Sequence, residues 1–140
     1  MKSLPLLALL LCALILPAGG ADEPRAKPAA GAGSVKNVGV EEFDKLRAGK
    51  NAVVLDVRTE KEFKGGHIPG AVNLDFNAPD FQTKVAELDK GKTYLVHCAG
   101  GVRSAKACDF LRQSGFKNVK NMLGGITAWS DKIDPSVPKY

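Results

Sequence analysis

The sequence predicts a single α/β domain with a central, parallel, five-stranded sheet flanked by helices on both faces. Short runs rich in Val, Leu and Ile alternate with segments whose apolar residues recur every three or four positions. This alternation, with short links between the runs, is typical of strand–helix–strand repeats that build a parallel sheet. The 140 residues, 44% of them hydrophobic and 25% charged, are enough for one compact domain and not for two.

The predicted elements follow one another through a domain that spans residues 34–133. Residues 35–38 are predicted as an edge strand, and apolar residues recur at helical spacing over 40–47. Residues 52–57 form an almost continuous apolar run, of the kind that a parallel sheet buries on both faces. The remaining predicted elements are a strand at 71–74, a helix at 81–88, a strand at 93–97, a helix at 104–113, a strand at 119–122 and a helical turn or more at 126–129.

Residues 1–33 precede this domain. A positive start at Lys2, an apolar stretch over 4–16 and a small-residue exit that ends at Ala21 are the three parts of a secretory signal peptide. The apolar stretch would reach about 20 Å as a helix, less than the roughly 30 Å of a bilayer core. We therefore expect residues 1–21 to be cleaved and the protein to be periplasmic or secreted. A lipid anchor at Cys12 is the minor alternative.

The remaining segments and the charge pattern limit the partners that we expect. Residues 22–33, rich in Ala, Gly and Pro, form a flexible lead-in, and residues 134–140 form a C-terminal tail. The net charge is +5, but the 20 basic residues are interleaved with 15 acidic ones instead of forming a block. Such a surface is typical of a solvated protein. We expect a monomer without a nucleic-acid partner.

The most informative segment is the loop that follows the strand at 93–97. Cys98 begins this loop and a helix follows it, so that backbone N–H groups and the helix dipole converge on the thiol. A pKa lowered from about 8.5 to roughly 6.5 would raise the thiolate fraction at pH 7 from ~3% to about three quarters. We therefore predict Cys98 as the catalytic nucleophile. The predicted substrate-binding residues follow it directly: Ala99, Gly100, Gly101, Val102, Arg103 and Ser104.

Three further residues are predicted to support this site. Asp56 ends another strand, and sites in open α/β sheets lie beyond the carboxyl ends of the strands. Asp56 and Arg58 are expected to hold this strand end and the next loop in shape. His67 lies in a Gly-Gly-His-Ile-Pro-Gly turn and is expected to make hydrogen bonds there. His97 is assigned to core packing, with tuning of Cys98 as the alternative.

Cys108 lies on the predicted helix that follows Cys98. A disulfide needs Cα atoms within about 7 Å, and Cys108 is more than one helical turn from the start of that helix. We therefore expect Cys108 to be buried and unpaired. A resolving role for its thiol is the alternative.

Three segments, in the same order, resemble motifs of the rhodanese family. Residues 56–71 resemble its first signature, residues 98–104 its active loop and residues 119–129 its terminal signature. The resemblance implies a single-domain thiosulfate sulfurtransferase of rhodanese fold. In that family the cysteine takes a sulfane sulfur from a small donor such as thiosulfate and becomes a persulfide. It then passes the sulfur to a thiophilic acceptor such as cyanide or a thiol, here including a protein thiol, and no metal or other cofactor is implied.

Alternatives to this function remain open at the level of the sequence. Phosphatases and arsenate reductases of the same fold place five residues between cysteine and arginine, whereas four residues separate Cys98 from Arg103. A shorter ring suits a sulfur atom and fits phosphate poorly, so these enzymes are the weaker alternative. A sulfur-relay or binding module with little turnover is the stronger one. Arg103 itself has two roles open to it, contact with the substrate or orientation of the loop through a carboxylate.

Overall fold

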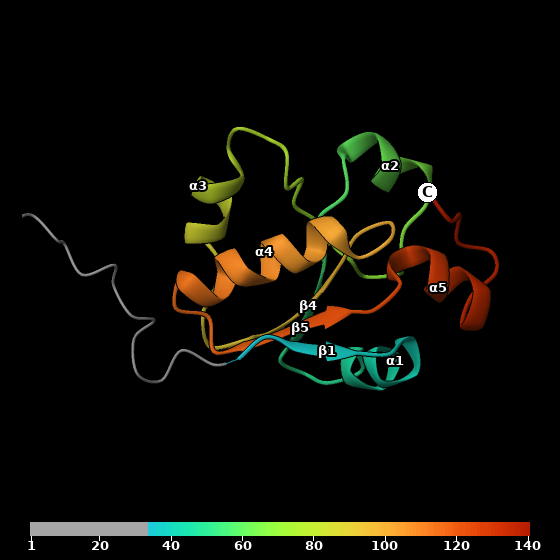
Figure 1. The fold of residues 1–140 in the computed structure, drawn as a ribbon, viewed down its shortest axis with the longest axis horizontal. Helices are drawn as coiled ribbons and strands as arrows, with labels where there is room; N and C mark the ends of the chain where they lie inside the picture. Colours follow the sequence, from blue (N-terminus) through green and yellow to red (C-terminus); the bar gives the residue numbers. More distant parts are fainter. Residues whose placement is uncertain (1–33) are drawn as a thin grey trace, which may run out of the picture.

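The computed structural model describes residues 34–140 (Figure 1). The signal peptide predicted over 1–21, the lead-in over 22–33 and the lipid anchor at Cys12 lie outside the described residues, so they stay predictions. In the described part, strands and helices alternate. The strands are β1 (Lys36–Val38), β2 (Ala52–Asp56), β3 (Val72–Asn73), β4 (Thr93–His97) and β5 (Asn118–Met122). The helices are α1 (Val40–Arg47), α2 (Glu60–Gly65), α3 (Phe81–Ala86), α4 (Val102–Gln113) and α5 (Gly125–Lys132).

The strands form one parallel sheet in the order β1-β5-β4-β2-β3. This confirms the predicted fold class, and β1 lies at an edge as expected. The central strands β2 and β4 pair in a register that aligns Asp56 with His97. Because parallel strands end at the same edge, this register brings the segments after Asp56 and after His97 together.

Helices cover both faces of the sheet, with α3 and α4 on one side and α1 on the other (Figure 1). Alternate side chains of β4 point to opposite faces, so that Val96 packs with Leu111 of α4, while Leu95 packs with Phe43 of α1 and Trp129 of α5. The two clusters of buried side chains therefore fix the sheet between two helical layers. The helices of these layers do not cover the carboxyl edge of the strands, where the loops lie.

The helix α2 is an element that the sequence analysis did not predict. None of its residues is buried, so the apolar periodicity that reveals an amphipathic helix is missing. Its start is stabilised by a capping box, in which the Glu62 N–H donates to Thr59 Oγ1 and the Thr59 N–H donates to Glu62 Oε2. The spacing Thr-x-x-Glu was the available signal for this helix.

Besides α3, which ends at Ala86 and not at residue 88, two further helices differ from their predicted bounds. The helix α4 begins at Val102, two residues before the expected start, because Gly101 adopts a φ of +113° and turns the chain directly into the helix. The helix α5 extends over eight residues instead of a short turn. Both helices therefore begin next to the loop that carries Cys98.

The C-terminal tail, residues 134–140, packs against the domain. Val137 is buried in the hydrophobic cluster that contains side chains of α1 and α5. Arg58 donates a hydrogen bond of 3.1 Å to the carbonyl oxygen of Tyr140, and Thr127 donates one of 3.0 Å to that of Lys139. The tail consequently ends beside α2, at the carboxyl edge of the sheet (Figure 1).

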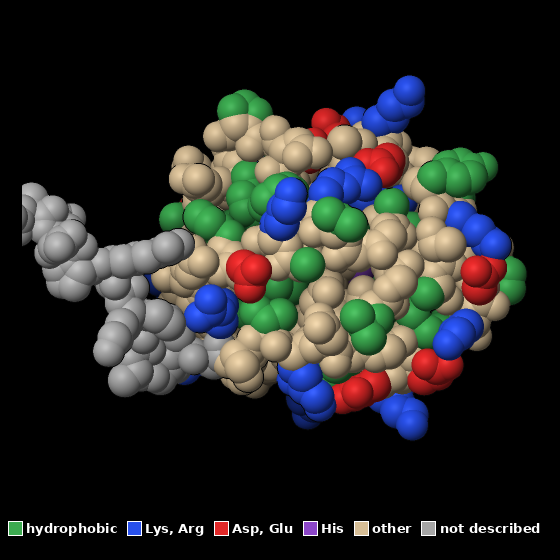
Figure 2. Space-filling view, in the orientation of Figure 1, with side chains coloured by type: hydrophobic (Ala, Val, Ile, Leu, Met, Phe, Trp, Pro, Cys, Tyr) green, Lys and Arg blue, Asp and Glu red, His purple; other side chains and the backbone are tan. Residues whose placement is uncertain are grey.

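Basic and acidic side chains are interspersed on the face of the molecule that Figure 2 shows. Exposed ion pairs in the described residues include Lys64 with Glu60 and Lys84 with Asp80. Among residues 34–140, no helix combines the length and the apolar character that crossing a membrane requires.

Candidate active site

The helix α5 holds the active loop, which we define as residues 98–104. The Ile126 N–H donates to the Cys98 carbonyl at 2.8 Å, and the Thr127 N–H donates to the Ala99 carbonyl at 3.3 Å. The Thr127 hydroxyl lies 3.2 Å from the same Ala99 oxygen. These bonds satisfy N–H groups in the first turn of α5 and fix the loop carbonyls on that side.

Glycine at position 125 permits this close contact. Gly125 has a φ of +59°, and a Cβ atom there would overlap the Ala99 carbonyl and lie 2.6 Å from the Cys98 carbonyl oxygen. No L-residue side chain fits such a space without movement of the loop. The glycine at position 125 therefore allows the start of α5 to contact the active loop.

The sulfur of Cys98 lies at the bottom of the active loop, where the residue is only 2% exposed. The Gly101 N–H donates to Sγ at 3.0 Å, and Ser104 Oγ lies 3.4 Å from Sγ. Burial raises the pKa of the Cys98 thiol, but hydrogen bonds from Ser104, Gly101 and Gly100 together outweigh burial and lower the pKa below its ordinary value. The arrangement stabilises a thiolate.

Cys108 has the opposite surroundings. It lies on α4 and faces the apolar core, where it is fully buried and unpaired, as expected. Burial raises the pKa of its thiol to about 12. Of the two cysteines in the described part of the chain, only Cys98 has the surroundings of a nucleophile.

Arg103 pairs with a carboxylate that the sequence analysis did not single out. Its two terminal nitrogens each donate to one carboxylate oxygen of Glu62, both at 2.9 Å. Thr59 also donates to Glu62 through its N–H at 2.9 Å and its hydroxyl at 2.8 Å. Hydrogen bonding to Arg103, and then to Thr59, outweighs partial burial and lowers the pKa of Glu62 to about 2. The first turn of α4 is thereby tied to the first turn of α2.

Asp56 and Arg58 form a fully buried ion pair below this edge of the sheet. Arg58 Nη2 donates to Asp56 at 2.6 Å and to the Gly66 carbonyl at 2.8 Å, while Nη1 donates to the Tyr140 carbonyl at 3.1 Å. The guanidinium therefore joins the end of β2 to the end of α2 and to the tail. These contacts connect segments of the scaffold.

The two histidines have different surroundings. His97 is fully buried; its Nδ1 lies 3.2 Å from the Cys98 carbonyl oxygen, and its ring packs edge-on against Phe43. Burial lowers the pKa of His97, opposed in part by the nearby Asp56 carboxylate. His67 is exposed instead, and its ring stacks on Phe63 at 3.8 Å between ring centroids.

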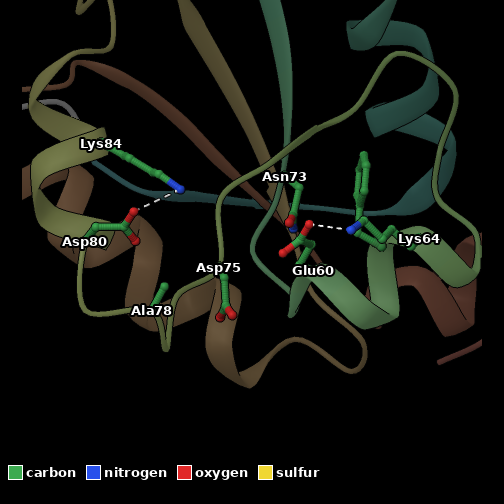
Figure 3. Close-up of a pocket in the computed structure, with 8 residues that line it drawn as sticks. Glu60, Lys64, Asn73, Asp75, Ala78, Asp80 and Lys84 are labelled. Atoms are coloured by element: carbon green, nitrogen blue, oxygen red, sulfur yellow. Dashed lines mark ion pairs between the residues drawn. The ribbon is translucent and has the colours of Figure 1, made fainter.

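A polar hollow of about 550 Å³ lies between α2 and the segment of residues 73–84. Figure 3 shows that exposed ion pairs, Glu60 with Lys64 and Asp80 with Lys84, line it. Asn73 also lines this hollow, and its side-chain amide donates to the backbone carbonyls of Asp56 and Arg58. The hollow thus adjoins the buried ion pair.

The profile of the rhodanese-like domain matches residues 39–132, about two thirds of the chain. The chain belongs to the rhodanese-like family. This confirms the resemblance seen in the three sequence motifs.

The rhodanese-like domain is similar to proteins of different names. It is 37% identical over 92 residues to the candidate sulfurtransferase YtwF of Bacillus subtilis, covering 66% of this chain and 86% of that protein. It is 42% identical over 88 residues to the tRNA uridine(34) hydroxylase of Cytophaga hutchinsonii, a match that covers 61% of this chain but only 28% of the hydroxylase. A rhodanese-like domain protein from Staphylococcus aureus has the same fold, with a TM-score of 0.62, 33% identity, and coverage of 71% of this chain and 95% of that one.

The rhodanese-like domain brings most of the predicted site residues together. The loop residues that we predicted as substrate-binding, 99–104, surround the Cys98 sulfur or begin α4 next to it. Asp56 and Arg58 lie below the loop, among the groups that hold the sheet edge. His67 bonds to Phe63 within its own turn, and no hydrogen bond joins it to the active loop within residues 34–140.

Glu62 is the residue of this rhodanese-like site that the sequence analysis missed. It lies 41 positions before Arg103, so nothing in the local spacing connects them. The capping box was a local signal for the helix of Glu62 but not for its ion pair. Within residues 34–140, the hydrogen bonds of Cys98 Sγ involve Gly101 and Ser104 and no carboxylate or imidazole, and they lower the pKa of the thiol.

Proposed function

We propose that this rhodanese-like domain is a sulfurtransferase that carries a sulfane sulfur on Cys98 as a persulfide. One observation supports this more than any other: the Gly101 N–H is directed at Sγ from 3.0 Å, and this loop lowers the pKa of the Cys98 thiol. A thiolate needs no general base to attack sulfur. The sulfurtransferase-type family to which the chain belongs agrees with this chemistry.

The proposed first step conserves atoms and electrons. The Cys98 thiolate attacks the outer sulfur of a donor such as thiosulfate, the Sγ–S bond forms, the S–S bond of the donor breaks, and sulfite leaves with that electron pair. The persulfide on Cys98 carries one negative charge. The N–H groups of the active loop remain directed at this charge, which is the preorganisation that favours the step.

In the second step an acceptor thiolate or cyanide attacks the outer sulfur of the persulfide. The bond between Sγ and that sulfur breaks, and Cys98 leaves as the thiolate that began the cycle. Ser104, whose Oγ lies 3.4 Å from Sγ, stabilises the leaving thiolate. A small-molecule acceptor or a protein thiol meets the requirements of this step.

The same loop supports phosphatase chemistry poorly. Phosphate transfer requires an arginine fork directed at the oxyanion, whereas both terminal nitrogens of Arg103 bond Glu62. With four residues between Cys98 and Arg103, the loop also offers fewer N–H groups than the five-residue rings of phosphatases. We therefore expect no hydrolysis of an aryl phosphate.

Mass spectrometry of the purified protein after incubation with sulfane-sulfur donors tests the proposal. We expect a gain of about 32 Da, one sulfur atom, on the peptide that contains Cys98, reversed by cyanide. Cys98→Ser should abolish both the gain and the turnover, because an unionised hydroxyl is a far poorer nucleophile. Cys108→Ser is the matched control and should retain the gain. Turnover close to wild type in Cys98→Ser would refute Cys98 as the sulfur carrier.

We also propose that the protein is exported through a signal peptide cleaved after Ala21. The charged start, the apolar stretch and the small-residue exit in residues 1–21 support this location. Sequencing of the N-terminus of protein from the periplasm or medium should give Asp22-Glu23-Pro24. Recovery of uncleaved protein from the cytosol alone would contradict export.

A further inference from the structure

The class of sulfur donor depends on how the site uses Arg103, and this inference rests on the proposed function. A doubly charged donor such as thiosulfate is favoured by cationic side chains that bond its sulfonate. The residues between Cys98 and Arg103 are Ala, Gly, Gly and Val, so none of their side chains donates a hydrogen bond. Arg103 is consequently the cation that the active loop itself supplies.

Glu62 neutralises this cation. Both terminal nitrogens of Arg103 bond the two carboxylate oxygens, and both side chains are about three-quarters buried. Thr59 fixes the carboxylate through two more hydrogen bonds. The planar fork of Arg103 is thus occupied, and the neutral ion pair offers a dianion no net attraction at the loop.

Two exposed apolar side chains lie on or beside the active loop. Val102 is 70% exposed and Leu123 is 53% exposed. They adjoin Gly101 and Gly124, whose backbones lie close together, since a Cβ on Gly101 would be 3.9 Å from the Gly124 nitrogen. Large exposed apolar side chains beside the loop favour contact with an organic group over contact with an inorganic dianion.

A second hollow of about 480 Å³ lies between α2 and the tail. Pro138 and Tyr140 line it from the tail, and the Tyr140 side chain is exposed. Glu62 lines it from α2, so the hollow adjoins the ion pair with Arg103 and through it the active loop. Lys61 is the exposed cation of this hollow, in solvent that screens its charge.

We propose that the preferred sulfur donor is an organic persulfide, R–S–SH, whose R group lies in the hollow between α2 and the tail. The Cys98 thiolate attacks the terminal sulfur, and the Sγ–S bond forms. The S–S bond of the donor breaks, and R–S⁻ leaves with that electron pair, while the transferred sulfur keeps its proton. The step needs no oxidant or reductant. Because the donor has no sulfonate, Arg103 can keep its hydrogen bonds to Glu62.

Single-turnover transfer to the purified protein tests this donor class. Thiosulfate and benzyl persulfide are compared by the rate at which the Cys98 peptide gains the mass of one sulfur. Each rate is divided by the rate of the same donor with free N-acetylcysteine, which removes the intrinsic reactivity of the donor. We expect the corrected rate to be at least about tenfold higher for benzyl persulfide. This factor corresponds to one charge-assisted hydrogen bond, which the sulfonate of thiosulfate does not receive because Arg103 bonds Glu62.

Glu62→Gln should release Arg103 and raise the corrected thiosulfate rate by about tenfold or more. Glu60→Gln is the matched control, because it removes the same charge from the same helix, where Glu60 pairs with Lys64 and not with Arg103 (Figure 3). It should leave the ratio of the two donors unchanged. Tyr140→Ser should lower the rate with benzyl persulfide more than the rate with thiosulfate.

Tyr140→Ser, which leaves α2 unchanged, keeps the proposal testable if Glu62→Gln fails to fold. Glu62→Gln combined with Arg103→Gln removes both charges of the pair, so the donor ratio should return toward that of the wild type. The donor class is overturned if wild type takes sulfur from thiosulfate at least as fast after correction, or if Glu60→Gln matches Glu62→Gln. The proposed function is overturned if neither donor modifies Cys98 while iodoacetamide still alkylates it.

Discussion

Cys98 and Cys108 are two thiols ten positions apart whose acidity differs because their surroundings differ. Cys98 receives hydrogen bonds from the active loop, which lower the pKa of its thiol despite burial. Cys108 has apolar neighbours, and burial raises the pKa of its thiol to about 12. Residue type alone therefore does not identify a nucleophile; the directed N–H groups do.

This difference predicts the pH dependence of alkylation. Because only thiolate reacts, the rate at Cys98 should rise with pH and level off above the folded pKa, with half of the maximum below about pH 8.5. Cys108 should stay unmodified up to about pH 10, since its pKa of about 12 keeps the thiol protonated. Iodoacetamide rates, resolved by peptide mass spectrometry from pH 5 to 10, measure both.

The unfolded protein is the control for this measurement. In denaturant the two thiols lose their surroundings, and both should reach half of the maximal rate near pH 8.5. A Cys98 profile that is the same in the folded and unfolded protein would show that the loop does not stabilise the thiolate.

At the scale of the elements, the beginning of α5 positions the active loop as directly as the beginning of α4 does. The first N–H groups of α5 bond loop carbonyls, while the Gly101 N–H at the beginning of α4 bonds the sulfur. The loop is therefore held from two sides by helix termini, which have N–H groups to donate. Its geometry depends on a segment that lies 28 residues later in the chain.

Gly125→Ala should disturb this arrangement twice. The alanine would adopt a φ of +59° at a cost, and its Cβ would overlap the Ala99 carbonyl. We expect a loss of about 2 kcal/mol or more in the free energy of unfolding. We also expect a roughly 100-fold slower formation of the persulfide, because a displacement of the loop by about 1 Å misaligns its donors. Urea unfolding and the mass-spectrometric rate measure the two effects.

Gly65→Ala is the control for Gly125→Ala. A Cβ at Gly65 would have no atom within 4 Å, so the free energy of unfolding should change by no more than about 0.5 kcal/mol. Equal free energies of unfolding for the two variants would mean that the contact between α5 and the active loop does not require glycine at position 125.

At the scale of the whole molecule, the buried guanidinium of Arg58 connects parts that are far apart in the sequence. It bonds Asp56 at the end of β2, the Gly66 carbonyl after α2 and the Tyr140 carbonyl, 82 positions away. Breaking a buried pair on one side leaves an uncompensated charge, which is costly. The position of α2, and with it Glu62, is thereby coupled to the end of the β2 strand.

The amino-acid sequence by itself determined the fold class, the parallel strands and the place of Cys98 at the start of a helix. These features depend on local causes: hydrophobic periodicity reports which face of an element is buried, and glycines report where the chain turns. The three motifs also identified the family. The same local signals left α2 unrecognised, because a helix with no buried residue has no apolar stripe.

Only the tertiary structure decided which partners the charged groups of the site have. Arg103 bonds Glu62 across 41 positions, and Gly125 approaches the Ala99 carbonyl across 26, through packing of separate elements on one sheet. An ion pair depends on distance in space, and no spacing in the sequence encodes that distance. The sequence thus placed the Cys98 thiol at this edge of the sheet, and the packing of α2 and α5 around it decided which charged groups of the site are paired.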